Sequence, residues 1–470
     1  MYLAFGARIL AAGALGIALA GTAAAGVALT PPGPAPARVI ITPGVRHIER
    51  ESRQGPSTTA QCEQSIQIAC YNPAQIEQAY SLPALYARGI TGKGSTIVIV
   101  DPYGSPTIVG DLRHFDSTEK VPDPPSLRII RPAGRVPAYS PDNANMVGWA
   151  SETTLDVEYA HTIAPGAKIL LVETPGGGSA GTVSMPQIVT AENYVVKHGL
   201  GDVISQSFVA TEQAVGSAAI RSLRGAYVAA YASHVTVLAG SGDSGAAGFQ
   251  SNQQNYYSYP VTAWPASDPL VTAVGGTRLS LDANGNRSSA DTVWNDTYSQ
   301  TANQLVNGNN GPNPLASGGG RSVIFGRPSY QYGARAVVGS HRGVPDISMN
   351  AACTSAVNVY QSFGGQPAGW YALCGTSEAA PLFAGIVALA DQAAGHPLGL
   401  INPALYKLAS EHAPGIVSVR SGNNTVSFRQ GGRSRTVRGF SAGPGYNLSV
   451  GLGTVNAQYL VTELAHLAGR

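Results

Sequence analysis

The stretch Cys374-Gly375-Thr376-Ser377-Glu378-Ala379-Ala380-Pro381 decides the fold of this chain, and it runs on into Leu-Phe-Ala-Gly-Ile-Val-Ala-Leu-Ala at 382–390. The run after the Gly-Thr turn is apolar and rich in small residues, which predicts a fully buried helix. We place Pro381 within the first helical turn, where its missing N–H costs little. Ser377 then lies at the positive end of the helix, where its hydroxyl either serves as a nucleophile or simply caps the helix.

Apolar, β-branched runs alternate with helical stretches over most of the chain. The predicted strands are 95–101, 127–130, 168–172, 202–205, 235–239 and 270–274, and the predicted helices are 73–80, 150–163, 185–198 and 214–233. Such alternation predicts an α/β fold with a mainly parallel central sheet and helices on both faces. We expect a single large domain over residues 71–470.

The N-terminal segment has the pattern of a targeting sequence. In residues 1–25, Arg8 precedes an apolar run at 9–20 and a small-residue cleavage site, which predicts a signal peptide. The alternative, an uncleaved anchor, would need a longer apolar run. Residues 26–70 predict a linker or short N-terminal extension. The expected location is therefore secreted or extracellular, with no membrane association after signal cleavage.

The cysteine count agrees with export, because disulfides persist outside the cytosol. Cys62 and Cys70 are close in sequence and could close a small loop. Cys353 would then pair with Cys374, just before Ser377. The sequence alone allows three connectivities.

Composition limits the partners and the conditions. Only 12% of residues are charged, the net charge is +2, and no basic block suggests a nucleic acid partner. A sparsely charged surface gains little self-repulsion as the pH falls, which suits acidic conditions. We expect a monomer.

A serine nucleophile needs a base, and the strongest candidates are two carboxylates. Glu152 and Asp156 are four residues apart on a predicted helix and therefore share one face. Apolar neighbours predict that this helix is buried, and a buried carboxylate pair can share one proton. An exposed acidic face is the alternative. His161, alone on the same helix, is more typical of a structural histidine.

Two predicted strands end in turns that could hold a ligand. One is Ser205-Gln206-Ser207-Phe208, and the other is Ala-Gly-Ser-Gly-Asp-Ser-Gly at 239–245. Ligands bind at the carboxyl ends of strands in open parallel sheets, although Gly, Ser and Asp are also ordinary turn residues.

Taken in order, Glu152-x-x-x-Asp156, Ser-Gly-Asp243-Ser-Gly and Gly-Thr-Ser377 resemble the sedolisin family of serine-carboxyl peptidases. Further similar strings are Tyr-Pro-Val-Thr-Ala-Trp-Pro-Ala-Ser at 259–267, Val-Gly-Gly-Thr at 274–277, Ser-Gly-Gly-Gly-Arg-Ser at 317–322 and Pro-Asp-Ile-Ser at 345–348. The resemblance covers about residue 71 to the C-terminus. It implies a subtilisin-like fold and a secreted, acid-acting endopeptidase or tripeptidyl-peptidase with polypeptide substrates.

By this resemblance, Ser377 attacks the scissile carbonyl, Glu152 is the general base, and Asp156 orients and tunes Glu152. Asp243 would lie in the oxyanion hole, where it must be protonated to donate a hydrogen bond. The resemblance also implies substrate-binding residues: Ser205, Ser207, Phe208, Val209, Ser317, Gly318 and Gly319.

Three departures from the family pattern stand out. Calcium is usual in the family, but Ser418 and Asn447 replace its two aspartate ligands and Arg420 lies close in sequence, which predicts weak or absent Ca²⁺ binding. Val209 stands where the family usually has glycine, which could narrow the specificity pocket. Fewer than fifty residues separate Ala25 from Tyr71, too few for the family's long inhibitory propeptide.

Two other functions remain as alternatives. A non-catalytic or degenerate exported protein could use the same scaffold to bind peptides. Another serine hydrolase, such as an esterase, is disfavoured because Ser377 does not lie in a Gly-x-Ser-x-Gly elbow.

Overall fold

A computed structural model of the chain describes residues 46–52, 55–176 and 185–468. The predicted signal peptide and the first part of the predicted linker lie outside these ranges. Over the described residues, no helix has both the length and the apolar character needed to cross a bilayer.

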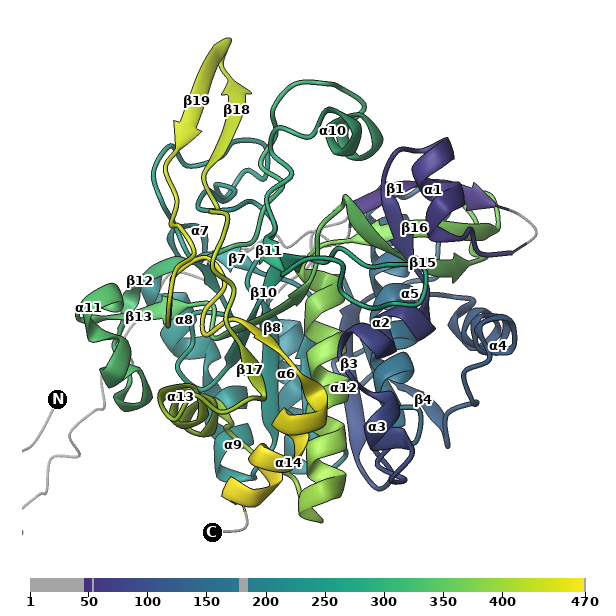
Figure 1. The fold of residues 1–470 in the computed structure, drawn as a ribbon, viewed down its shortest axis with the longest axis horizontal. Coiled ribbons are helices and arrows are strands. Elements are labelled where there is room, and N and C mark those ends of the chain that lie inside the picture. The colour runs from purple at the N-terminus through teal and green to yellow at the C-terminus, as the bar shows by residue number, and fades with distance from the viewer. Residues whose placement is uncertain (1–45, 53–54, 177–184, 469–470) are drawn as a thin grey trace, which may run out of the picture. The chain divides into compact units, whose positions relative to one another are not determined.

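The centre of the fold is an eight-stranded sheet in the order β11-β10-β8-β6-β3-β5-β4, with β14 also paired to β10 (Figure 1). Its strands are β3 (Thr96–Pro102), β4 (Leu127–Ile130), β5 (Lys168–Thr174), β6 (Val203–Gln206), β8 (Thr236–Gly240), β10 (Thr272–Arg278), β11 (Thr292–Val293) and β14 (Ile347–Asn350). All pairings are parallel except that of β10 with β11. The predicted α/β fold with a mainly parallel central sheet is confirmed.

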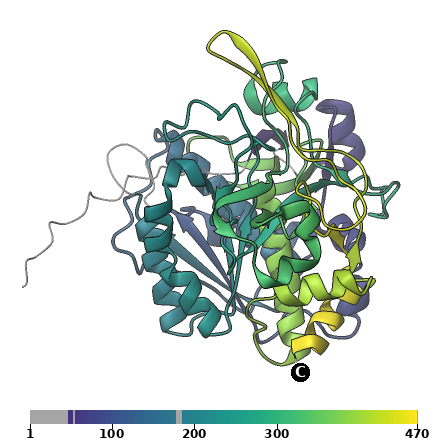
Figure 2. The ribbon, with the colours of Figure 1, turned by 90° about the vertical axis from the view of Figure 1, so that its left-hand side faces the viewer.

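Side chains of the central strands alternate between two cores. On β3, Ile97 and Ile99 belong to one core, and Val98 and Val100 belong to the other. The first core contains α5 (Ala144–Ile163), α12 (Thr376–Ala394) and α14 (Ala457–Ala468), whereas α6 (Met185–Lys197), α8 (Ser217–Leu223) and α9 (Gly225–Ala232) pack in the second. Helices therefore cover both faces, as Figures 1 and 2 show. This alternation is the period of two expected of a buried strand.

Helix α12 packs closely against α5, as its small residues predict. A Cβ on Gly385 would lie 2.5 Å from the Cβ of Ile163, so only glycine allows this approach. The helix begins at Thr376, and Pro381 therefore lies inside it rather than in the first turn as predicted. Since proline lacks an N–H, the carbonyl of Ser377, four residues earlier, receives no helical hydrogen bond from that position.

A second sheet lies against the first core, in the order β1-β16-β15-β2. Its strands are β1 (Arg46–Ser52), β2 (Ala69–Tyr71), β15 (Ser355–Gln361) and β16 (Gly369–Cys374), and α1 (Thr59–Ser65) precedes β2. Strand β1 and helix α1 therefore come from residues 26–70, the segment predicted as a linker or short extension. The domain boundaries remain a prediction. The disulfides are Cys62–Cys70 and Cys353–Cys374, the pairing that the sequence favoured.

The remaining elements connect these layers. They are α2 (Pro73–Ala79), α3 (Pro83–Tyr86), α4 (Ile108–Glu119), β7 (Ala210–Thr211), α7 (Glu212–Val215), β9 (Ala263–Trp264), α10 (Gln300–Asn307), β12 (Gly320–Gly326), η1 (Ser329–Ala334), α11 (Arg335–Val338), β13 (His341–Val344), α13 (Asn402–Ser410), β17 (Ile416–Val417), β18 (Val426–Gln430), β19 (Arg433–Val437) and β20 (Thr454–Val455). The stretch predicted as one helix at 214–233 is divided between α7, α8 and α9. Gly216, with a φ of 84°, ends α7 because that backbone conformation cannot continue a helix.

Candidate active site

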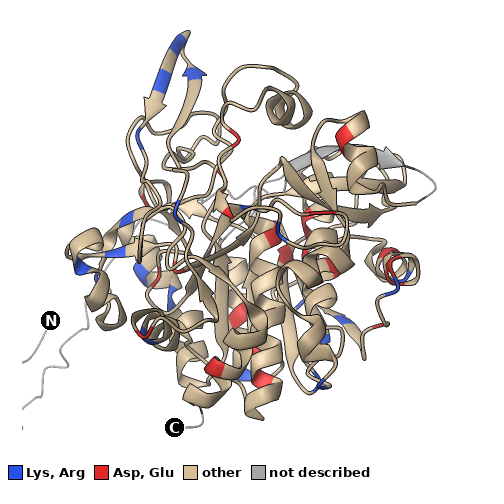
Figure 3. Ribbon diagram, viewed as in Figure 1, with Lys and Arg blue, Asp and Glu red and all other residues tan. Residues whose placement is uncertain are grey.

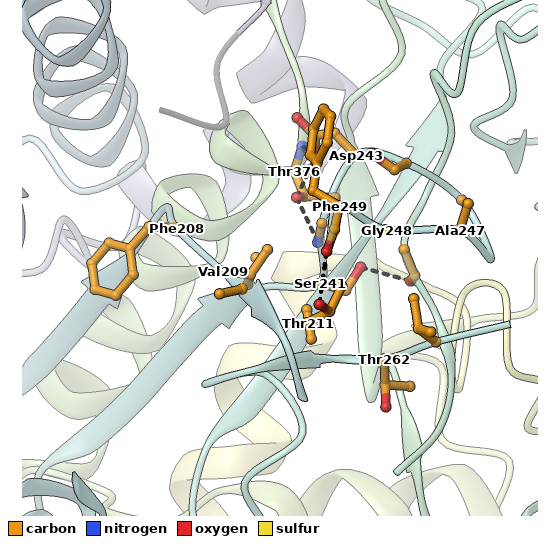
Figure 4. Close-up of a pocket in the computed structure, with 18 of the residues that line it drawn as sticks. Phe208, Val209, Thr211, Ser241, Asp243, Ala247, Gly248, Phe249, Thr262 and Thr376 are labelled. Atoms are coloured by element: carbon orange, nitrogen blue, oxygen red, sulfur yellow. Dashed lines mark hydrogen bonds between the residues drawn. The ribbon is translucent and has the colours of Figure 1, made fainter. Parts of the chain in front are cut away.

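One pocket brings together segments that are far apart in the sequence. It lies where β6 and β8 end and α12 begins, and its lining comes from 207–211, 240–245, 247–249, 253, 261–263, 318–319 and 376–377. Figure 4 shows Val209, Thr211, Phe249 and Thr262 around Ser241, Asp243 and Thr376. The position agrees with the rule that ligands of parallel sheets bind at the carboxyl ends of the strands.

Ser377 reaches this pocket through a tight strand-to-helix turn. Strand β16 ends at Cys374, and Gly375 takes a φ of 124°, in the region that favours glycine. Helix α12 starts at the next residue, so Ser377 is the second residue of a long helix. A developing negative charge beside this N-terminus would be stabilised by the helix dipole.

Asp243 is fixed by the residue that precedes the candidate nucleophile. Its Oδ1 accepts hydrogen bonds from the backbone N–H of Thr376 at 2.8 Å and from the Thr376 hydroxyl at 2.7 Å. The same hydroxyl accepts a bond from the N–H of Gly242 at 3.1 Å. These contacts, drawn as dashed lines in Figure 4, make Oδ1 an acceptor and leave Oδ2 as the oxygen that can carry a proton.

The two carboxylates predicted on one helix face are both buried in α5. Asp156 is connected to the nucleophile segment through Ser207, whose hydroxyl donates to Asp156 Oδ1 at 2.8 Å. That hydroxyl also lies 3.4 Å from the carbonyl oxygen of Ser377, which Pro381, four residues later, cannot supply with a hydrogen bond. Helix α5, the end of β6 and the start of α12 therefore meet at one hydroxyl.

Electrostatics in this region favour protonated carboxyl groups. Burial raises the pKa of Asp156 well above its usual value, and the charges of Asp101 and Glu152 raise it further, while the Ser207 hydroxyl opposes the shift. Burial also raises the pKa of Asp101 to about 7, and Glu173 adds to that shift. Burial and the neighbouring carboxylates therefore favour the neutral form of Asp156.

The predicted substrate-binding residues divide into two groups. Ser207, Phe208, Val209, Gly318 and Gly319 line the pocket, although the Phe208 ring turns away from Asp243 in Figure 4 and packs on Trp149. A Cβ on Gly242 would lie 3.4 Å from the Val209 side chain, so Val209 extends toward the opposite wall.

Ser205 and Ser317 do not line the pocket. The Ser317 hydroxyl accepts from the N–H of Gly276 at 2.9 Å and donates to the carbonyl of Ser449 at 2.9 Å, which holds two loops together. Ser205 is fully buried in β6.

Histidine is placed away from this chemistry. His161 is buried, with Nε2 2.8 Å from the carbonyl of Pro122 and 3.4 Å from Asp116. None of the histidines whose side chains the structure describes lines the pocket. Within that part of the chain, the titratable side chain hydrogen-bonded to the residue next to Ser377 is the carboxyl group of Asp243, not an imidazole.

Two residues of the site had no predicted role. Thr376 was only part of the turn motif, and its hydrogen bonds to Asp243 depend on a contact across 133 residues. Asp101 follows the apolar run of β3, and an acidic residue at the carboxyl end of a buried strand is a signal that could have identified it.

The residues at the expected calcium position do not fit that ion. Asn447 Oδ1 already accepts from the N–H and hydroxyl of Ser449 and from the N–H of Val450. The Ser418 hydroxyl lies 3.5 Å from the guanidinium of Arg420. Calcium affinity depends on the negative charge of the ligands, and neither the Ser418 nor the Asn447 side chain carries one. No group of three or more His, Cys, Asp or Glu side chains in the described ranges could hold a metal.

A model of the subtilase family matches residues 133–431, which include all the residues that line the pocket and both members of the carboxylate pair. This chain belongs to the subtilase family. Within it, the relatives are of the sedolisin type, as the motifs indicated. Kumamolisin from Bacillus sp. (strain MN-32) is 33% identical over 83% of this chain and 63% of its own length. Sedolisin from Pseudomonas sp. (strain 101) is 26% identical over 82% of this chain and 60% of its own length.

A solved structure extends the similarity to the fold. Pseudomonas sedolisin, a serine-carboxyl proteinase complexed with two molecules of pseudo-iodotyrostatin, has a TM-score of 0.67 at 25% identity, over 86% of this chain and all of that chain. The chain spans about 60% of the length of the two curated relatives described above.

Proposed function

We propose that this chain is a serine-carboxyl peptidase that hydrolyses peptide bonds in acid through an acyl-enzyme on Ser377. The observation that carries the proposal is the single pocket at which Ser377 and Asp243 meet, with Asp156 joined to it through Ser207. The sedolisin-type relatives support the same chemistry. Polypeptides are the proposed substrates.

In the proposed reaction, the Ser377 oxygen bonds to the scissile carbonyl carbon while its proton passes to Glu152. The resulting oxyanion accepts a hydrogen bond from the protonated Oδ2 of Asp243. As the C–N bond breaks, Glu152 returns the proton to the leaving amine. Water then attacks the ester carbonyl and gives a proton to Glu152. As the ester C–O bond breaks and the acid product leaves, Glu152 passes that proton to the Ser377 oxygen.

The chemistry explains why acid would be needed. A carboxylate near its usual pKa of about 4 can serve as a base at that pH, where an imidazole would be almost fully protonated. Asp243 must be neutral to donate to an oxyanion, because a charged carboxylate would repel it. The raised pKa of Asp156 keeps a proton beside Glu152 in the same range.

The substrate backbone would lie between the 207–209 segment and Gly318–Gly319, with one side chain entering the pocket. Except for Asp243, the side chains around this pocket carry no charge, which favours an uncharged substrate residue. Val209 limits the size of that residue.

We infer that the protein is exported. The sequence pattern of residues 1–25 and the two disulfides support this location.

A direct test is to incubate the purified protein with an unfolded protein at pH 3–5, beside a Ser377→Ala control. We expect new peptides only with the wild type. Cleavage by neither protein at any pH would leave a non-catalytic peptide-binding role as the better interpretation. Equal cleavage by both would assign the chemistry to another residue.

A further inference from the structure

Positive charge is concentrated in one stretch near the C-terminal end of the chain. Between Glu411 and Glu463 there are five arginines and no acidic residue. The chain has 29 Lys and Arg against 27 Asp and Glu, so without these five the balance is 24 against 27, or −3. A local charge of +5 in an otherwise slightly acidic chain indicates an interaction surface for an anion.

Most of these arginines lie on one projecting hairpin, formed by β18 and β19 (Figure 1). Gly431 and Gly432, with φ values of 59° and 75°, form its two-residue turn, a geometry that matches the twist of the strands. The base is anchored by the buried side chains of Val426, Phe428 and Val437. The outer half belongs to no larger sheet, so it stands clear as a stiff arm.

The arginines of the hairpin are available to a partner. Arg429, Arg433, Arg435 and the adjoining Arg438 are all exposed. Their guanidinium groups form no ion pair with any residue that the structure describes. Figure 3 shows the blue of arginine along both strands and no red on them. Charges on an edge strand can also serve only to prevent sheet-to-sheet aggregation, and the test below distinguishes that role.

The hairpin is connected to the wall of the candidate active site by stacked rings. Phe428 packs on Tyr256 with ring centroids 4.9 Å apart, and Tyr256 stacks on Phe249 at 4.3 Å. Phe249 lines the pocket. The amide oxygen of Gln430 accepts from the N–H of Tyr256 at 2.8 Å. A chain extending from the pocket past this wall would therefore reach the arginines.

We propose that the β18–β19 hairpin is an exosite that binds an acidic segment of the polypeptide substrate next to the residues held in the pocket. This inference rests on the proposed peptidase function and specifies its substrate class. Guanidinium groups stay charged at every relevant pH and lower the pKa of a carboxylate beside them, so Asp and Glu in the segment remain ionised in mild acid. The Gly-Gly tip offers no apolar side chain to insert into a lipid surface, which favours a peptide.

The test measures binding separately from cleavage. In a Ser377→Ala background at pH 4.5, fluorescence anisotropy gives the Kd of a labelled peptide with a run of Glu and Asp, and of its Gln and Asn counterpart. The variant R429Q/R433Q/R435Q should bind the acidic peptide about tenfold more weakly and the neutral peptide equally well. The matched control R88Q/R113Q/R128Q, which removes three exposed arginines elsewhere, should leave both Kd values unchanged. Added salt should raise the Kd of the acidic peptide and leave the Kd of the neutral peptide unchanged.

In the protein with Ser377 intact, the hairpin variant should raise KM for the acidic substrate and leave kcat unchanged. Equal Kd values for the two peptides, or the same loss in the control triple, would overturn the proposal. Loss of binding to anionic phospholipid vesicles without loss of peptide binding would assign the surface to lipid instead. If the hairpin variant aggregates but binds both peptides as before, the arginines serve only to keep the edge strands from pairing with other sheets. If the peptidase function itself is wrong, neither peptide is cleaved although the Kd difference persists.

Discussion

At the residue scale, two hydroxyl groups decide where protons can lie in the candidate site. Ser207 donates to Oδ1 of Asp156, and Thr376 donates to Oδ1 of Asp243. In each case the hydroxyl makes one carboxyl oxygen an acceptor, so a proton on that group must sit on the other oxygen. Neither hydroxyl needs to touch the substrate to affect the reaction, and both act by positioning a carboxyl group.

Thr376→Val should lower kcat by about tenfold to a hundredfold with little change in KM, because Asp243 loses a donor and its preferred orientation. Thr376→Ser keeps the hydroxyl and should retain most of the wild-type kcat. Steady-state kinetics on one peptide, with melting temperatures measured in parallel, check this. Equal kcat for the Val and Ser variants would show that the hydroxyl has no positioning role.

Val209→Gly should enlarge the pocket, because the Val209 side chain extends toward Gly242 on the opposite wall. We expect the substrate residue preferred in the pocket to change from small to large apolar. The ratio of kcat/KM for Phe to kcat/KM for Ala should rise about tenfold. Val209→Ala should fall between the two. A cleavage-site profile on a peptide library gives the readout, and an identical profile for all three proteins would exclude Val209 as a specificity residue.

At the scale of the element, α5 and α6 both bury acidic residues. Burial places a protonated carboxyl group in the core at low pH, which costs less than a buried charge. Helix α5 also shows how a boundary depends on capping. The helix begins at Ala144 rather than at 150 as predicted, because the Asn143 side chain accepts from the N–H groups of Asn145 and Met146. The Asn143 signal was present in the sequence.

Glu192 on α6 tests the effect of such burial. Its carboxyl group is 1% exposed in the second core, and burial raises its pKa to about 8. Since this pKa is above that of the unfolded chain, stability is full below about pH 4.5 and decreases as the pH rises toward 8. Glu192→Gln should therefore stabilise the fold at pH 7, on the order of 2 kcal/mol, and have little effect at pH 4.

Melting temperatures of the wild type and Glu192→Gln at pH 4 and pH 7 provide the comparison. Glu63→Gln, at an exposed position on α1, is the matched control and should change neither value. A shift of the same size at both pH values would mean that the charge of Glu192 is not the cause.

At the scale of the whole molecule, the sequence predicted those elements whose residue pattern is local, and not the contacts between distant segments. The central strands and the buried helix after Ser377 were found because apolar periodicity is local. The second sheet was not, because β1 pairs with β16 more than 300 residues away. The role of Thr376 was missed for the same reason, whereas Asp101 carried a local signal, its position at the carboxyl end of a buried strand. The position of Pro381 was misjudged because the helix begins immediately after Gly375.

The loop at the expected calcium position gives a prediction for the whole fold. The side-chain oxygen of Asn447 accepts hydrogen bonds from Ser449 and Val450 within this loop, so it is already occupied by protein donors. Addition of EDTA should therefore leave the melting temperature unchanged within about 1 °C, and added Ca²⁺ should not raise it. A drop with EDTA that Ca²⁺ reverses would show that the loop binds the ion through other oxygens.

The most direct measurement is kcat/KM for one peptide from pH 3 to pH 8, for the wild type and for Glu152→Gln. If a carboxylate activates the serine, the wild type works below neutral pH and the variant loses at least about a hundredfold at every pH. If the variant keeps wild-type activity, or if both profiles rise around pH 6.5 as an imidazole loses its proton, Glu152 is not the base.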